Sequence, residues 1–133
     1  MADRVDKMSE YARVSLAGIR ILNGGIALIA PKLMARRLGV DPTANPAMLY
    51  ALRMFGVRTV VIGAQLLLPD GPVRAQAVRT APVIHASDAT AAALAARTGR
   101  LPGRMGLTTT LISTVNTVLA LMAQARTADP ARR

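Results

Sequence analysis

The chain has 133 residues, enough for one domain, and its 17 Lys and Arg residues exceed its seven Asp and Glu residues to give a net charge of +10. Only 18% of the residues are charged and 52% are hydrophobic, whereas a soluble domain usually carries about 25% charged residues. From Tyr11 onward only Asp41, Asp70, Asp88 and Asp129 are acidic, too few for the charged outer faces of soluble helices.

The basic residues do not predict nucleic-acid binding. Most arginines lie in short clusters between hydrophobic runs, and the 2% aromatic content provides no platform on which bases could stack. Clusters of this kind suit the anionic headgroup zone of a membrane. We therefore expect a lipid bilayer with anionic headgroups as the main partner, and no nucleic acid.

The first part of the chain predicts an interfacial segment and a membrane helix. Residues 1–13 are charged and are expected at the water interface, and the first hydrophobic run spans about 14–34. Pro31 should kink or end this helix. The residues that follow form a short amphipathic piece that Gly39 ends.

Three further hydrophobic runs follow. Asn45 is a good N-cap and Pro46 suits a first helical position, and the runs span about 47–68, 73–96 and 105–125, followed by a polar tail at 126–133. Each run has roughly the 20 residues that cross a bilayer. We predict an all-α fold: an antiparallel bundle of four transmembrane helices within residues 14–125, with a short interfacial helix after the first.

Polar residues in the four runs are expected at one depth. Counting from the midpoint of each run at about 1.5 Å per residue places six side chains near the bilayer centre as a central polar network: Arg58, Asp88, His85, Arg53, Asn23 and Asn116. Every predicted helix contributes at least one of them.

The charges in this layer predict an ion pair. Arg58 requires an anion, and Asp88 is the only acid inside a predicted span. We expect Arg58 to pair with Asp88, with Arg53 as second choice and His85 beside Asp88 on the same helix face. Arg20 and Arg79 lie nearer the opposite interface and should snorkel toward it. The network either holds the helices in register or serves as a proton relay or anion site.

Small residues predict close helix packing. Gly18 and Gly25 lie seven residues apart in the first run, and Gly56 and Gly63 do the same in the second. Stripes of this kind let helix backbones approach closely in lipid.

No enzyme motif is present, so no catalytic residues are predicted. The chain has no cysteine and one histidine, which argues against a metal site. We expect no cofactor.

Three segments together carry a resemblance to a known family. They are Arg20-Ile21-Leu22-Asn23-Gly24, then Arg53-Met54-Phe55-Gly56-Val57-Arg58, and His85-Ala86-Ser87-Asp88. In this order the chain resembles a family of small, uncharacterised four-span bacterial membrane proteins, classed as a domain of unknown function. The resemblance covers roughly residues 14–125 and supports the fold, but it implies no activity.

The expected function is therefore stated at the level of class. The first hypothesis is a non-enzymatic accessory subunit of a larger membrane complex, since four spans leave almost no soluble part for catalysis. The second is a small homodimeric transporter or channel that uses the central Arg, His and Asp residues. The third is a membrane-embedded lipid-binding module or enzyme. The expected location is the bacterial inner membrane, as a multi-pass protein with both termini in the cytoplasm.

Overall fold

The computed structural model describes residues 2–125, which are helical apart from short connections. The helices in this range are α1 (Ala2–Ile29), α2 (Pro31–Arg37), α3 (Pro46–Leu67), α4 (Pro72–Arg97) and α5 (Gly103–Gln124). The predicted all-α class is confirmed. Helices α3, α4 and α5 begin and end within two residues of the last three hydrophobic runs. The predicted tail at 126–133 lies outside the described residues.

The first helix is longer at its start than the hydrophobic run and ends earlier than predicted. It begins at Ala2, so the charged residues 2–13 are helical and continue directly into the apolar part of α1. It ends at Ile29 rather than near residue 34, because Pro31 cannot continue the hydrogen-bond ladder and instead opens α2. Helix α2 stops before Gly39, whose φ of 73° is the left-handed conformation that favours glycine.

The connection from α2 to α3 is stabilised by its own side chains. Thr43 donates its backbone N–H and its hydroxyl to the Asp41 carboxylate, at 2.8 and 2.7 Å. These hydrogen bonds hold the pKa of the exposed Asp41 below its usual range. Asn45 occupies the N-cap position of α3, as predicted, but its side chain makes no capping hydrogen bond.

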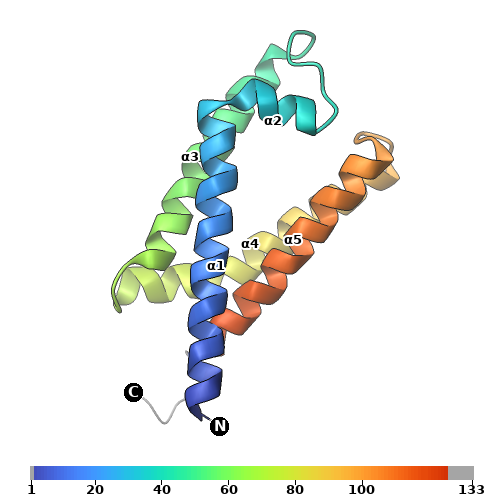
Figure 1. Cartoon of the computed structure of the whole chain (residues 1–133). Helices are drawn as coiled ribbons and strands as arrows, with labels where there is room; N and C mark the ends of the chain where they lie inside the picture. Colours follow the sequence, from blue (N-terminus) through green and yellow to red (C-terminus); the bar gives the residue numbers. More distant parts are fainter. Residues whose placement is uncertain (1, 126–133) are drawn as a thin grey trace.

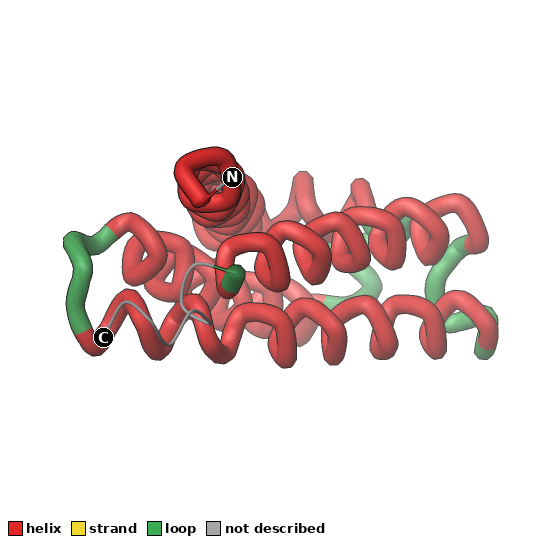
Figure 2. The backbone as a smooth tube through the Cα atoms, turned by 90° about the horizontal axis from the view of Figure 1, so that it is seen from below, coloured by secondary structure: helices red, strands yellow, loops and turns green. Residues whose placement is uncertain are grey.

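The long helices form two packed pairs. Helix α1 lies along α3, helix α4 lies along α5, and α1 also contacts α5. Figure 1 shows the pairs meeting near the end of α5 and diverging toward α2, and Figure 2 shows the α4–α5 pair side by side from below. At the α2 end, a methyl group on Gly39 would come within 2.7 Å of the Pro102 ring, so α2 and the α4–α5 turn touch.

Three of these helices have the length and apolar character to cross a membrane: α1 over Asp3–Ile29, α3 and α5. Only 22% of the most apolar stretch of α3, and of α5, is buried. Leu111, Val115 and Val118 of α5, for example, point outward at helical spacing and are about half exposed. Apolar helix faces turned outward are what lipid requires, so the chain is a helical membrane protein.

The α1–α3 pair approaches most closely at glycines. A methyl group on Gly56 would lie 2.7 Å from both the Gly24 carbonyl oxygen and the Leu28 nitrogen, and one on Gly63 would lie 2.9 Å from the Ile21 side chain. Gly56 and Gly63 therefore pack as predicted. In α1 the glycine that packs against Gly56 is Gly24, so the prediction of Gly18 and Gly25 for this contact was wrong.

The two predicted glycines of α1 face away from α3. A methyl group on Gly18 or on Gly25 would meet no other atom within 4 Å. Gly25 differs from Gly24 by one residue, which is about 100° of rotation around the helix. Helix α3 thus packs closely against the face of α1 that carries Gly24, next to the face that carries Gly25.

Candidate functional site

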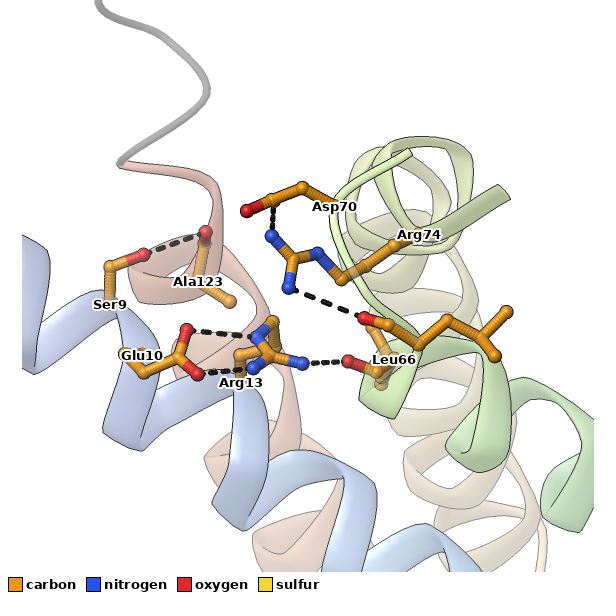
Figure 3. Close-up of polar contacts among 8 residues, drawn as sticks. Ser9, Glu10, Arg13, Leu66, Asp70, Arg74 and Ala123 are labelled. Atoms are coloured by element: carbon orange, nitrogen blue, oxygen red, sulfur yellow. Dashed lines mark hydrogen bonds and ion pairs between the residues drawn. The ribbon is translucent and has the colours of Figure 1, made fainter. Parts of the chain in front are cut away.

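Polar side chains join the helices near the start of α1 and the end of α5 (Figure 3). Arg13 of α1 is buried, donates to the Leu66 carbonyl at the C-terminal end of α3, and pairs with Glu10. A cation at this place complements the negative end of the α3 dipole. Ser9 donates to the Ala123 carbonyl of α5 at 3.0 Å. The Arg13 contact attaches α1 to α3, and the Ser9 contact joins the two helix pairs at this end.

A second contact at this end repairs the interruption that Pro82 makes in α4. Proline has no N–H, so the carbonyl of Val78, four residues earlier, loses its helical partner. The amide of Gln124 donates to this oxygen at 3.2 Å and to the Arg79 carbonyl at 2.9 Å. The end of α5 is thereby attached to the middle of α4.

A cavity of about 590 Å³ is lined by residues of α1, α2, α3, α4 and α5, with Met34 and Arg37 contributed by α2. Along α5 it runs from Met105 to Asn116, a distance of about 16 Å at the rise of an α-helix. One wall is apolar, with Leu52, Phe55 and Ile112 among its residues. The volume falls within the range of about 300–1,000 Å³ that is common for small-molecule sites.

Five of the six residues predicted as a central network line this cavity. They are Asn23 of α1, Arg58 of α3, His85 and Asp88 of α4, and Asn116 of α5. The sixth, Arg53, is exposed and does not line it. Five residues that were expected at one depth, from four different helices, therefore line one cavity.

The predicted Arg58–Asp88 ion pair is absent. Within residues 2–125, neither of these side chains has an ion pair or a hydrogen bond with the other, and Asp88 has none with Arg53. Arg58 and Asp88 face the same cavity from α3 and α4, and the charges of both act on Arg20. The two charged side chains thus line one cavity without pairing with each other.

The buried cation of this site is Arg20, which the sequence placed among the snorkelling residues. It is only 3% exposed, and its Nη1 contacts Nε2 of the buried His85. A guanidinium can only donate, so Nε2 accepts and the neutral ring carries its proton on Nδ1. Arg20 and Asn23 are three residues apart, as are His85 and Asp88. This spacing places the two residues of each pair on one helix face, and it is the sequence signal that could have indicated that Arg20 faces the site with Asn23.

Two polar atoms of the site have no partner. Arg20 Nε and Asn116 Oδ1 are both buried without a hydrogen bond, and both residues line the cavity. Arg20 and Asn116 are 3% and 7% exposed. Among the described residues neither atom has a partner, and both are covered by protein atoms, so Arg20 and Asn116 line the cavity through other atoms of their side chains.

The cavity opens sideways between α3 and α5. Five of its lining residues are exposed, namely Arg37, Phe55, Arg58, Thr108 and Ile112. Because α3 and α5 are membrane-crossing helices by length and composition, such an opening faces the lipid.

Metal chemistry has no candidate at this site. Within the described part of the chain, no group of three or more His, Cys, Asp and Glu side chains is arranged to hold a metal ion.

The comparisons with known proteins add no relative: no family model, curated protein or solved structure matches this chain. The resemblance to a four-span family stays a prediction.

Proposed function

We propose that this chain is a non-enzymatic membrane protein that binds a small molecule in its central cavity. One observation carries the proposal: a cavity of about 590 Å³ is lined by apolar side chains together with ionisable side chains from several helices, namely Arg20, Arg37, Arg58, His85 and Asp88. An apolar cavity on which a few polar groups converge is typical of a small-molecule site. This corresponds to the lipid-binding module among the hypotheses from sequence, without the enzyme.

A variant that fills the cavity tests this proposal. Thr109→Phe places a ring in the cavity, whereas Thr114→Phe adds the same ring to an exposed face of α5 that does not line it. We expect wild type and Thr114→Phe to retain a bound molecule through purification in mild detergent, and Thr109→Phe to lose it, as measured by native mass spectrometry. Equal retention by both variants would place the molecule elsewhere.

The same purification bears on the other two hypotheses. A larger protein present at fixed stoichiometry would make the cavity part of an accessory subunit. A self-dimer that carries flux in vesicles would make the cavity a transport site. Turnover of the retained molecule by the purified protein would contradict the non-enzymatic proposal.

We further propose four membrane spans, with α4 as the third to cross, in a bacterial inner membrane. Helix α4 has 26 residues, enough to span a bilayer. Its charges support the proposal, since Arg74 and Arg97 lie near its two ends and Asp88 lines the cavity. An intramembrane acid that faces a cavity avoids much of the cost of contact with lipid.

Single cysteines test this topology, because the natural chain has none. With four spans and cytoplasmic termini, Gly71→Cys in the α3–α4 turn should react only from the cytoplasmic side. Thr98→Cys in the α4–α5 turn should react with an impermeant thiol reagent from outside intact cells. Labelling of both positions from the same side would mean that α4 does not cross, and the reverse pattern would invert the orientation.

A further inference from the structure

The cavity carries more positive than negative charge. Arg20, Arg37 and Arg58 line it, and among the described residues Asp88 is the one acid that does. The His85 ring is neutral, because its Nε2 accepts from Arg20. Three positive charges and one negative charge leave an excess of two positive charges. The cavity therefore favours a molecule that has an anionic group.

Two of these arginines lie at the opening of the cavity. Arg37 of α2 and Arg58 of α3 are both exposed, and within residues 2–125 neither has an ion pair or a hydrogen bond. A guanidinium only donates hydrogen bonds, and its planar fork matches the oxygens of a phosphate group. Both side chains are thus available to an acceptor that comes from outside the protein.

Arg37 and Arg58 lie close enough in depth to reach one head group. Helix α2, which ends with Arg37, runs sideways from the end of α1 (Figure 1). Gly56 packs against Leu28, three residues before α2 begins at Pro31, and Arg58 follows Gly56 by two residues. At the rise of a helix, the Arg58 backbone therefore lies roughly 8 Å deeper than the start of α2. A long arginine side chain covers much of this distance when it extends toward the interface.

Apolar side chains border the same opening. Phe55 of α3 and Ile112 of α5 line the cavity and are exposed, and Leu52 and Met105 also belong to its wall. The opening between α3 and α5 faces lipid, so a hydrocarbon chain can enter it from the bilayer without crossing water. A small polar anion would leave these walls uncovered, whereas a molecule with a hydrocarbon chain would cover them.

We infer that the cavity binds an acidic phospholipid, which enters from the bilayer. The phosphate diester of its head accepts hydrogen bonds from Arg37 and Arg58, and one acyl chain lies along Phe55 and Ile112. A diester has one negative charge and only accepts hydrogen bonds, as these two donors require. A zwitterionic phospholipid also has a diester, but its ammonium group would add to the excess of positive charge. This inference rests on the proposed function and names the class of molecule that the cavity takes.

The test compares two phospholipids that have the same chains and different heads. The protein, purified in dodecyl maltoside, is titrated with dioleoyl phosphatidylglycerol, whose head is anionic, or with dioleoyl phosphatidylcholine, whose head is zwitterionic. Native mass spectrometry measures the fraction of protein that has lipid bound. Phosphatidylglycerol should half-saturate the protein at a roughly tenfold lower concentration than phosphatidylcholine, which corresponds to about 1.4 kcal/mol.

Two double variants of equal net charge separate this site from a general attraction to acidic head groups. Arg37→Gln with Arg58→Gln removes both arginines at the opening. Arg36→Gln with Arg53→Gln removes one exposed arginine from each of the same two helices, and neither of these lines the cavity. The first double variant should raise the half-saturation concentration of phosphatidylglycerol roughly tenfold. The second should leave it unchanged, and circular dichroism checks that both remain folded.

Every other outcome overturns the inference. Equal losses in the two double variants would mean that the preference comes from diffuse charge. Displacement of phosphatidylglycerol by inorganic phosphate would mean that the arginines bind a free anion. If wild type binds both phospholipids equally but loses a retained molecule in Thr109→Phe, the inference fails while the proposed function stands. If nothing is retained or bound, both fail.

Discussion

Gly56→Ala should destabilise the protein by about 1–3 kcal/mol, the usual cost of forcing an added carbon into a packed interface. The new methyl group would lie 2.7 Å from two backbone atoms of α1, the Gly24 oxygen and the Leu28 nitrogen. Backbone atoms in a helix cannot turn aside as a flexible side chain can, so α1 and α3 must separate. The measurement is the free energy of unfolding of the purified protein in detergent.

Gly25→Ala is the matched control and should have the opposite sign. A methyl group at this position meets nothing within 4 Å, and alanine favours a helix over glycine by roughly 0.5–1 kcal/mol. We expect Gly25→Ala to be neutral or slightly stabilising. If Gly25→Ala costs as much as Gly56→Ala, α1 presents a different face to α3.

The sequence could indicate that glycines bring the first two long helices together, but not which ones. Gly24 and Gly25 are adjacent, and each is compatible with a stripe along α1. The choice depends on the rotation of α1 about its axis, which is set by contacts with two partners at once, α3 and α5. A pattern within one helix carries no information on that rotation.

The ends of the helices, and the depth of residues along each helix, could be predicted from the sequence more readily than the rotation of α1. Proline positions set the starts of α2, α3 and α4, since each begins at a proline. Depth along a helix follows from a constant rise per residue, which is why five of the six network residues line one cavity.

Partner choice within the polar network could not be predicted, because it depends on where the helix pairs diverge. The α1–α3 pair and the α4–α5 pair are joined by the hydrogen bond from Ser9 to the Ala123 carbonyl, and they separate farther along. Arg20 contacts His85, while Arg58 and Asp88 line the same cavity without pairing. Charge alone favoured the wrong pair, since it identifies complementary groups and not the distance between them.

His85→Leu should destabilise the protein by about 3 kcal/mol, at the upper end for a buried group that loses its partner. The Arg20 guanidinium is 3% exposed and contacts His85 Nε2. Without this acceptor, a buried cation is left with one fewer hydrogen bond, and burial makes that loss costly. Arg20→Met should cost less, since it leaves only a neutral ring nitrogen unsatisfied.

The double variant Arg20→Met with His85→Leu decides whether this contact is a coupled pair. When both partners become apolar, no polar group is orphaned, so the double variant should be more stable than His85→Leu alone. Groups in contact usually show coupling energies of about 0.5–3 kcal/mol in such a cycle. The parallel cycle of Arg58→Met with Asp88→Ala should show a smaller coupling, because no hydrogen bond or ion pair joins these side chains across the cavity. Additive costs for Arg20 and His85, with strong coupling between Arg58 and Asp88, would mean that the ion pair expected from the sequence forms in the membrane and that Arg20 lies elsewhere.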